Sequence, residues 1–302
     1  MYWEDVEMLK VKRALSLILA LVMCCVLFSI AVSAEGAVRE LYVSAAGSDE
    51  AAGTQDAPLA SLAKAADIVN KDENGTAFVI HVVDDLTATA CARFYNHDVT
   101  IVGDGETAPV VTRGEGFRTQ SDPARSWYNP AMIEVVGSAI LGDDSEPTGE
   151  LHKASLRLEN ITLDDNGIHA GSKFMYASSN GTGQTSGTSN TEIVQDAIIS
   201  TYNGVGTIIL GKGTTLKNFG GMTAIYDAGA GTVIMENGSL ICDDTRLFTI
   251  STPADGQIRR TEESLSAIHL CGRGARLDMQ AGSKICDLRN ASALNIDGTV
   301  SK

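Results

Sequence analysis

A unit of three short apolar strands separated by two turns occurs three times near the C-terminal end of the 302-residue chain. Its clearest copy covers residues 224–243, a second covers 267–287 and a weaker third covers 197–218. Short strands and turns that repeat along a chain are the sequence pattern of a right-handed parallel β-helix. We therefore expect an all-β fold in which the copies stack as successive turns of a solenoid.

The copies align on three anchor glycines, Gly213, Gly238 and Gly282. Residues three before the anchor, five before it and three after it are apolar in every copy: Leu210, Met235 and Met279; Ile208, Val233 and Leu277; Leu216, Ile241 and Ile285. Positions that differ by two share one face of a strand, so these columns predict the solenoid core. Five residues after each anchor stand Asn218, Asp243 and Asp287, types that tolerate left-handed backbone geometry at a bend. We interpret them as a ladder of turn residues.

The same alignment predicts which side chains face outward. Tyr226 and His269 each follow an inward isoleucine and should face solvent. Cys242 and Cys286 also share one outward position, and stacked strands would bring their Cα atoms to about 4.8 Å, within reach of a disulfide. Side chains on parallel neighbours point the same way, which favours two free thiols, although the sequence leaves both states open. No Cys-x-x-Cys pair is present, so no metal site is predicted.

The N-terminal stretch has the features of a secretory signal peptide. A basic cluster, Lys10 to Arg13, precedes an apolar run over residues 14–32 that closes on Val32-Ser33-Ala34. This pattern predicts a signal peptide over residues 1–34, with cleavage before Glu35 and a secreted, extracellular or cell-wall-associated protein. Residues 1–7 include three acids, which is unusual ahead of the basic cluster, so Met8 is an alternative start. A membrane anchor is the alternative, because the run approaches the roughly 20 residues that span a bilayer.

Charge narrows the possible partners of residues 35–302. The formal net charge of the chain is −15, and residues 1–34 contribute equal numbers of acids and bases. An acidic surface disfavours nucleic acid and anionic membranes, so neither partner is predicted after signal cleavage. Acidic polysaccharides would be repelled as well, unless a cation such as Ca²⁺ bridged the charges.

A capping helix is expected over about residues 58–70. Leu59, Leu62, Ala63, Ala66 and Val69 fall at helical spacing, and the aspartate at position 56 is available as the N-cap. An amphipathic helix at this place would cover the open end of a solenoid, where exposed core and unpaired strand edges otherwise recruit other chains.

The residues around this helix resemble a known entry motif. The segments are Tyr42-Val43-Ser44, Gly47-Ser48-Asp49, Gly53-Thr54, Pro58-Leu59, Ser61-Leu62 and Lys64-Ala65, and they resemble the start of pectate-lyase-like β-helix proteins. The later Gly-Ser-x-Ile repeats resemble those of large secreted cell-surface proteins of Gram-positive bacteria. The resemblance implies one pectin-lyase-like domain over residues 35–302 of an extracellular protein. It is specific for fold and does not by itself imply a lyase.

Two features bear on how complete the repeat is. The insertion from Asp244 to Ser266 between the two best copies is either a degenerate extra turn of the solenoid or one excursion from it, and the alignment of the flanking copies favours the excursion. The chain ends at Lys302, shortly after a new apolar run at residues 294–296. Without a closing helix this end would be prone to aggregate, so we expect the sequence to be truncated from a longer protein.

Carboxylates with a nearby base are the candidate catalytic groups. The resemblance implies that enzymes of this fold use acids, often with Ca²⁺, and a Lys or Arg base in one lateral groove. Asp164 and Asp165 follow the most regular strand, and Asp244 with Arg259 forms a second candidate set. Asp, Asn and Gly also dominate solvated turns, which is the competing interpretation. No catalytic signature of the hydrolases on this fold accompanies either set.

Arg125, Trp127 and Tyr128 form the candidate ligand-binding set. Aromatic faces stack on sugar rings, while a guanidinium bonds hydroxyls or carboxylates. The alternative is that both rings fold back over the flank of the solenoid.

Two functions are consistent with the sequence. The preferred hypothesis is an adhesin-like, glycan-binding stalk segment that has no catalytic centre or cofactor of its own and whose partner is an extracellular polysaccharide or a host or plant glycan. The alternative is a polysaccharide lyase or glycoside hydrolase, with Ca²⁺ as its cofactor if it is a lyase. The regular repeats and the missing catalytic signature favour the first.

Overall fold

The computed structural model describes residues 38–73, 75–114, 117, 131–137, 154–167, 197–201, 206–219, 223–227, 231–244, 249–251, 259–261, 266–270, 274–289 and 291–296. The chain divides into two compact units, Met1–Ala37 and Val38–Lys302. The predicted signal peptide lies outside the described residues, and the description below concerns the second unit. Among the described residues, no helix is long and apolar enough to cross a membrane.

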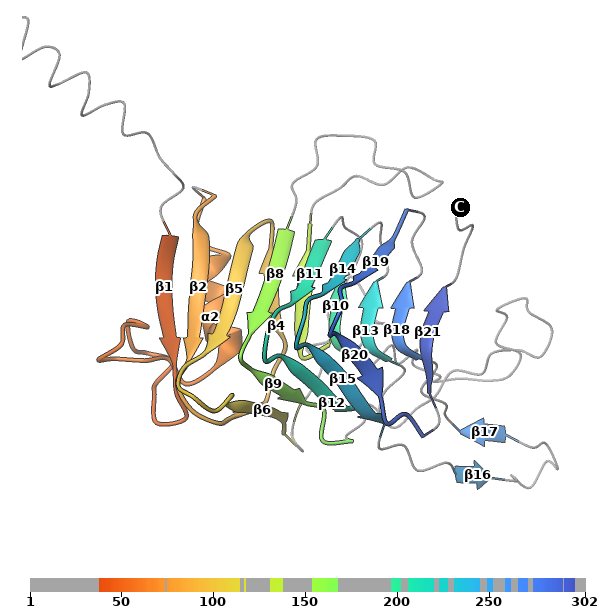
Figure 1. The fold of residues 1–302 in the computed structure, drawn as a ribbon. Helices are drawn as coiled ribbons and strands as arrows, with labels where there is room; N and C mark the ends of the chain where they lie inside the picture. Colours follow the sequence, from red (N-terminus) through yellow and green to blue (C-terminus); the bar gives the residue numbers. More distant parts are fainter. Residues whose placement is uncertain are drawn as a thin grey trace, which may run out of the picture. The chain divides into compact units, whose positions relative to one another are not determined.

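Three parallel sheets make up almost all of the described structure (Figure 1). Sheet 1 contains β1 (Val38–Val43), β2 (Ala77–Val82), β5 (Asp98–Gly103), β8 (Ala154–Glu159), β11 (Gly206–Leu210), β14 (Thr232–Met235) and β19 (Arg276–Met279). Sheet 2 contains β3 (Leu86–Ala88), β6 (Val110–Arg113), β9 (Thr162–Asp164), β12 (Thr215–Phe219), β15 (Leu240–Asp244) and β20 (Lys284–Cys286). Sheet 3 contains β4 (Ala92–Tyr95), β7 (Ile133–Val136), β10 (Ala197–Thr201), β13 (Thr223–Asp227), β18 (Ser266–Leu270) and β21 (Ser292–Ile296).

The chain visits the three sheets in the same order each time. From β2–β3–β4 to β19–β20–β21 it passes through sheets 1, 2 and 3, and each strand pairs in parallel with its equivalent in the next passage. We call each passage a coil. The prediction of an all-β protein built from repeated parallel strands is confirmed.

Inward columns run through the stack in the predicted register. Leu210 pairs with Met235 and Met235 with Met279, while Leu216, Ile241 and Ile285 form a second column in sheet 2. Sheet 1 extends the first column back to Leu41 through Ile80, Ile101 and Leu158. Up to Met235 and Ile241 these side chains belong to one continuous apolar core, against which Ile285 is partly buried, whereas Met279 at the last coil is exposed. Burying the apolar surface is the main favourable contribution to folding.

The predicted turn ladder is also present. Asn218, Asp243 and Asp287 have φ angles of 56°, 55° and 55°, in the left-handed region that few side chains adopt. Asn and Asp are the non-glycine types most often found there, because a short polar side chain bonds local backbone groups. The repeated residue type therefore reflects a repeated bend.

The insertion between the two best copies is an excursion, as the alignment favoured. β13 pairs directly with β18 and β15 directly with β20, so no coil is inserted between them. The insertion itself carries a short antiparallel hairpin, β16 (Thr249–Ser251) with β17 (Arg259–Thr261).

The single helix among the described residues is α2 (Leu62–Val69), inside the range expected for a helix. Its N-cap is Ser61, whose side chain accepts a hydrogen bond from the backbone N–H of Lys64 at 3.1 Å, and not Asp56 as predicted. The reason lies at the edge of sheet 1. Leu59 bonds the backbone of Tyr42 and forms a parallel bridge with Val43, so the chain is still extended at this point.

Outward side chains are less exposed than the alternation predicted. Tyr226 and His269 pair in register but are buried, with 7% and 4% of their surface exposed, and their rings meet edge to face at 5.3 Å. Cys242 is 7% exposed. In β10, β13 and β18 the side chains on both faces are buried, whereas the prediction assumed a solvated outer face. Cys91, Cys242 and Cys286, the described cysteines, are free thiols.

Candidate ligand-binding groove

Asp164 and Asp165 point to different partners and do not form one catalytic pair. Asp164 accepts hydrogen bonds from the Asn166 backbone and the Asn218 amide, both at 2.8 Å, and its second oxygen lies 3.2 Å from the Lys217 ammonium. Asp165 is 1% exposed and binds Arg113. Neighbouring residues of an extended chain face opposite ways, which separates the two acids. They therefore do not converge with a base in one groove.

The Arg113–Asp165 pair lies in the interior. Arg113 Nε donates to Asp165 Oδ1 at 2.5 Å, Nη2 donates to the Ala197 carbonyl at 2.7 Å, and the guanidinium lies 4.4 Å from the centre of the Phe117 ring. Burying two charges is tolerated when they are paired and hydrogen-bonded in this way. The pair joins the ends of β6, β9 and β10, so its geometry indicates a structural role.

The other predicted site residues are not brought together among the described residues. Asp244 is fully buried and accepts hydrogen bonds from the backbone N–H groups of Arg289 and Ala291 at 2.5 and 2.6 Å, which positions the turn before β21. Arg259 lies in β17, and its side chain is not among those described. Arg125, Trp127 and Tyr128 lie outside the described residues.

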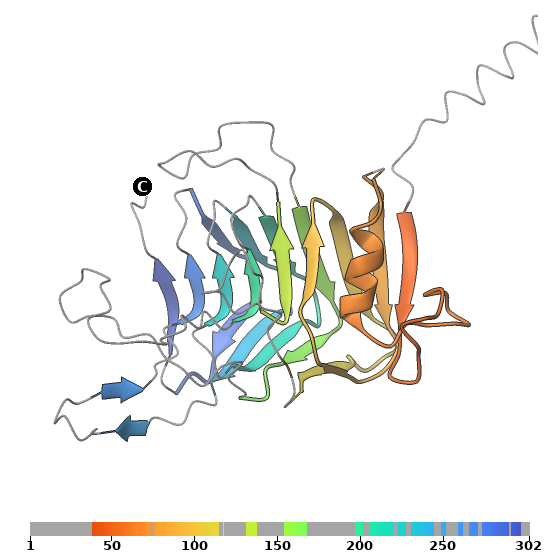
Figure 2. The same ribbon diagram turned by 180° about the vertical axis from the view of Figure 1, so that it is seen from behind.

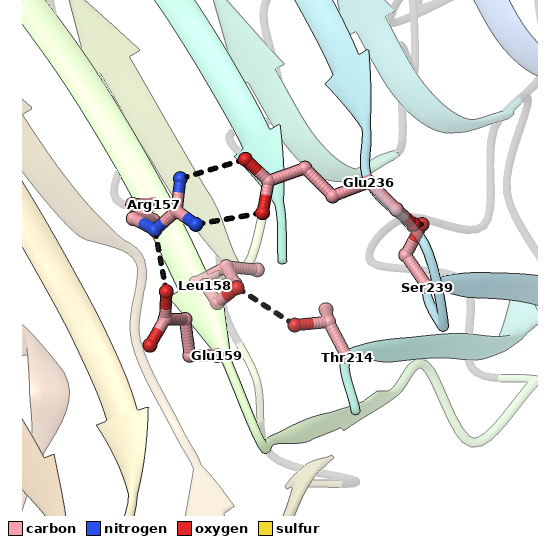
Figure 3. Close-up of polar contacts among 6 residues, drawn as sticks. All are labelled: Arg157, Leu158, Glu159, Thr214, Glu236 and Ser239. Atoms are coloured by element: carbon pink, nitrogen blue, oxygen red, sulfur yellow. Dashed lines mark hydrogen bonds and ion pairs between the residues drawn. The ribbon is translucent and has the colours of Figure 1, made fainter. Parts of the chain in front are cut away.

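A charged cluster on the outer face of sheet 1 links separate coils (Figure 3). Arg157 donates to Glu159 at 2.6 Å and to both carboxylate oxygens of Glu236 at 3.0 and 2.6 Å. The hydrogen bonds that Arg157 donates to Glu236, and with a smaller effect to Glu159, raise the pKa of Arg157. Every charge in this cluster is already paired, so the cluster fastens coils and offers no free group to a ligand.

An open groove of about 420 Å³ lies between α2 and the first strand of sheet 3. Figure 2 shows the helix, in orange, beside the first strands of the stack. The polar residues of the lining are Asp49, Ser61, Lys64, Asp67, Asn70, Thr89, Arg93 and Tyr95. This volume is within the range of roughly 300–1,000 Å³ that small-molecule sites occupy. The groove is therefore the best candidate site among the described residues.

Asn70 holds the two walls of the groove together. It is the C-cap of α2, and its amide donates to the Arg93 carbonyl at 2.7 Å and accepts from the Tyr95 backbone N–H at 2.9 Å. These are the hydrogen bonds that a neighbouring strand would make with β4. His97 adds a second link, because its ring nitrogens lie 2.5 Å from the Tyr95 carbonyl and 3.0 Å from the Asp72 carbonyl. The groove is thus built on a fixed helix and a fixed strand.

The aromatic group of the groove is Tyr95, which is 37% exposed. Phe94 is fully buried, so alternation turns Arg93 and Tyr95 outward. Arg93 Nε donates to Glu134 at 2.5 Å. Burial is the largest single effect and lowers the pKa of Arg93, but Glu134, with smaller effects of Cys91 and Tyr95, outweighs it and raises the pKa. The guanidinium is therefore a permanent charge in the wall beside an exposed ring.

Cys91 also lines the groove, but its chemistry is suppressed. Burial, with a smaller effect of the Glu134 charge, raises the pKa of the thiol. The thiolate is the nucleophilic form of cysteine, so this thiol is unsuited to covalent catalysis. Among the described residues no cluster of three or more His, Cys, Asp or Glu side chains has the arrangement of a metal site.

The sequence contains a signal for this groove that motif reading did not use. Alternation in Ala92–Tyr95 turns Tyr95 outward, and the helical spacing that buries Leu62, Ala66 and Val69 leaves Lys64 and Asp67 on the other side of α2. What the sequence does not contain is the docking of the helix on β4, which brings the two sets together.

The chain was compared with known proteins. No protein-family model matches the sequence, and no curated protein and no solved structure is significantly similar to it.

Proposed function

We propose that this protein is a secreted or cell-surface parallel β-helix that serves as a glycan-binding stalk segment and has no catalytic centre of its own. The observation that carries the proposal is the groove between α2 and β4, in which Tyr95 is exposed beside charged side chains. Aromatic faces stack on sugar rings, and charged or amide groups bond sugar hydroxyls.

The order and register of the three sheets support a parallel β-helix that serves as a stalk. Three parallel sheets visited in a fixed order, with equivalent residues in register, are what a parallel β-helix requires. The right hand follows from the strong preference of parallel crossover connections for that hand. The pattern agrees with the resemblance of residues 42–65 to pectin-lyase-like proteins. Such a stack grows by adding coils, which suits a spacer that holds a binding site away from a surface.

α2 is proposed to be the N-terminal cap. It buries Leu62, Ala65, Ala66 and Val69 against the core, and its C-cap Asn70 bonds the edge of β4. Covering a sheet edge in this way prevents pairing with another chain. The cap also forms one wall of the groove, so the binding site and the closure of the stack use the same element.

An extracellular location is inferred from the sequence. The basic cluster, apolar run and small residues of positions 1–34 are those of a secretory signal peptide. The partner would then be an extracellular polysaccharide or a glycan of a host or plant surface. The enzyme alternative gains no support from the described residues, because Asp164 and Asp165 do not face a common groove.

The test is binding of the purified full chain to a glycan array, followed by titration calorimetry with the best ligand. Replacing Tyr95 with alanine should weaken binding about tenfold, the effect expected when a stacked ring is lost. Tyr42→Ala is the matched control, since this tyrosine lies on the outer face of sheet 1 and stacks on His81. Binding that is unchanged in Tyr95→Ala would exclude the groove, and depolymerisation of any glycan would exclude a non-catalytic role.

A further inference from the structure

We infer that the groove selects electrically neutral sugars, and that Lys64 and Asp67 are the residues that set this selectivity. The inference rests on the proposed glycan-binding function of the same groove. It concerns whether the groove binds neutral or charged sugars. The resemblance to pectate-lyase-like proteins does not imply a preference for neutral ones.

Lys64 and Asp67 are adjacent and uncommitted. They stand three residues apart on α2, so both lie on one face of the helix with Cβ atoms about 5–6 Å apart. Both line the groove, and neither charged group has a hydrogen-bond or ion-pair partner among the described residues. An ammonium donates hydrogen bonds and a carboxylate accepts them. Two neighbouring hydroxyls of a sugar can satisfy both groups at once, because each hydroxyl donates and accepts.

The other charged side chains of the groove, and the amide of Asn70, are already bonded within the protein. Asp49 accepts hydrogen bonds from the Ala60 N–H at 3.0 Å and the Ser61 hydroxyl at 2.9 Å. Arg93 binds Glu134, and Asn70 binds the backbone of β4. Recruiting any of these groups to a ligand would compete with a bond of the fold. Among the charged residues of the lining, Lys64 and Asp67 are therefore the two whose groups are free to bond a ligand.

The charges of the lining balance, so the groove offers no net attraction to an ionic ligand of either sign. The lining contains two acids, Asp49 and Asp67, and two bases, Lys64 and Arg93, within a chain of net charge −15. A uronate carboxylate would meet Asp67 and the acidic surroundings, while an amino sugar would meet Lys64 and Arg93. Like charges brought together in a partly desolvated site oppose binding. A neutral sugar meets neither penalty.

The first experiment compares ligands on the full chain by titration calorimetry. The probes are cellohexaose, xylohexaose and mannohexaose as neutral chains, hexagalacturonic acid as the acidic chain and a chitosan hexamer as the cationic chain. We expect at least one neutral chain to bind about tenfold more tightly than either charged chain. Its affinity should change by less than about twofold when the NaCl concentration is raised tenfold, since screening acts on charged ligands.

The second experiment changes the two selecting residues. Asp67→Asn and Lys64→Gln should each weaken the neutral chain about tenfold, the loss expected for one hydrogen bond to a charged group. Lys71→Gln and Glu106→Gln remove the same charges at exposed positions away from the groove and should have no effect. Asp67→Lys leaves three bases and one acid in the lining, so it should bind hexagalacturonic acid better than the unchanged protein does.

The outcomes separate this inference from the proposed function. A preference of the unchanged protein for hexagalacturonic acid or chitosan overturns the inference, and so does equal behaviour of the Asp67 and control variants. In either case, a loss of binding in Tyr95→Ala still supports the groove as a glycan site. Failure of every probe and of the array to bind removes both.

Discussion

The side chains of one inward column are buried at the N-terminal end of the stack and exposed at the C-terminal end. Leu41 begins the column in β1 and is 1% exposed, whereas Met279 ends it in β19 and is 44% exposed. Leu294 and Ile296 in β21 are likewise 38% and 45% exposed. An inward position is therefore not enough to bury a side chain. Burial needs another layer of structure beyond the coil, and a layer is present among the described residues at the N-terminal end only.

At the N-terminal end, residues 59–70 make contacts like those of a neighbouring coil, although their sequence does not follow the repeat. Leu59 N–H donates to the Tyr42 carbonyl at 2.8 Å, as a strand beside β1 would, and Asn70 bonds the edge of β4. α2 adds the apolar cover. The lesson is that covering the first coil requires partners for the hydrogen bonds of the sheet edge as well as cover for the apolar core.

The largest expected effect comes from shortening the side chains at the two ends of the inward column and comparing the loss of stability. Leu41→Ala removes buried atoms and should lower the free energy of unfolding by about 2–5 kcal/mol, while the exposed Met279→Ala should cost less than about 1 kcal/mol. Urea denaturation followed by circular dichroism measures both. Equal losses would mean that the two ends are sealed alike in solution.

Removing the hydrogen bonds that join the end of α2 to β4 should have the next largest effect. Asn70→Ala leaves a carbonyl and an N–H of β4 without their partners and should cost about 1–3 kcal/mol. The control is Asn295→Ala in β21, where the amide contacts the His269 ring, and its cost should be smaller. Stability is again read from urea denaturation. An Asn70 variant as stable as the control would show that apolar cover alone seals the end.

The helix cap can be tested separately from the edge. Ser61→Ala removes the acceptor for the Lys64 N–H and should cost about 1 kcal/mol, whereas Ser61→Asn keeps an acceptor without placing a second carboxylate beside Asp49 and should cost less. Thermal unfolding distinguishes the two variants. If both lose the same stability, the hydroxyl matters for its bond to Asp49 and not for capping.

The smallest expected effect compares the thiols of the last two coils. Burial, followed by a hydrogen bond with Asp243, raises the pKa of Cys242 from 9.0 to about 12. At Cys286 the bond with Asp287 is the main cause of the raised pKa. Because the folded state holds the Cys242 proton more tightly, this contribution to stability is present below pH 9 and falls as pH rises toward 12.

Urea denaturation at pH 7.5, 9 and 10 measures that slope. Cys242→Ala should flatten the decline above pH 9 more than Cys286→Ala does. The opposite ranking would contradict the larger effect of burial on Cys242.

The sequence predicted the columns and the turn ladder because both follow from local spacing. Apolar residues two apart must share a face, and the repeated Asn or Asp had to meet a repeated bend, so Met235 and Asp243 were placed correctly. The same reasoning could not say whether an outward face is covered. Tyr226 and His269 point outward and are buried, because alternation defines a direction and not the surroundings.

The candidate groove could not be predicted for a different reason. Lys64 and Tyr95 meet because α2 docks on β4, and the sequence gives no rule for the place where a helix docks on a sheet edge. The helix start shifted to Ser61 since the edge of sheet 1 holds Leu59 in extended form. In both cases a tertiary contact overrode a correct local tendency.

The bond between Arg157 and Glu236 reaches past a whole coil. β8 pairs with β11 and β11 with β14, so the guanidinium on β8 grips a residue that follows β14 (Figure 3). A stack held only by adjacent layers would peel one layer at a time when pulled lengthwise. The Arg157–Glu236 ion pair connects three successive coils directly, so under a pulling force we expect these coils to unfold together.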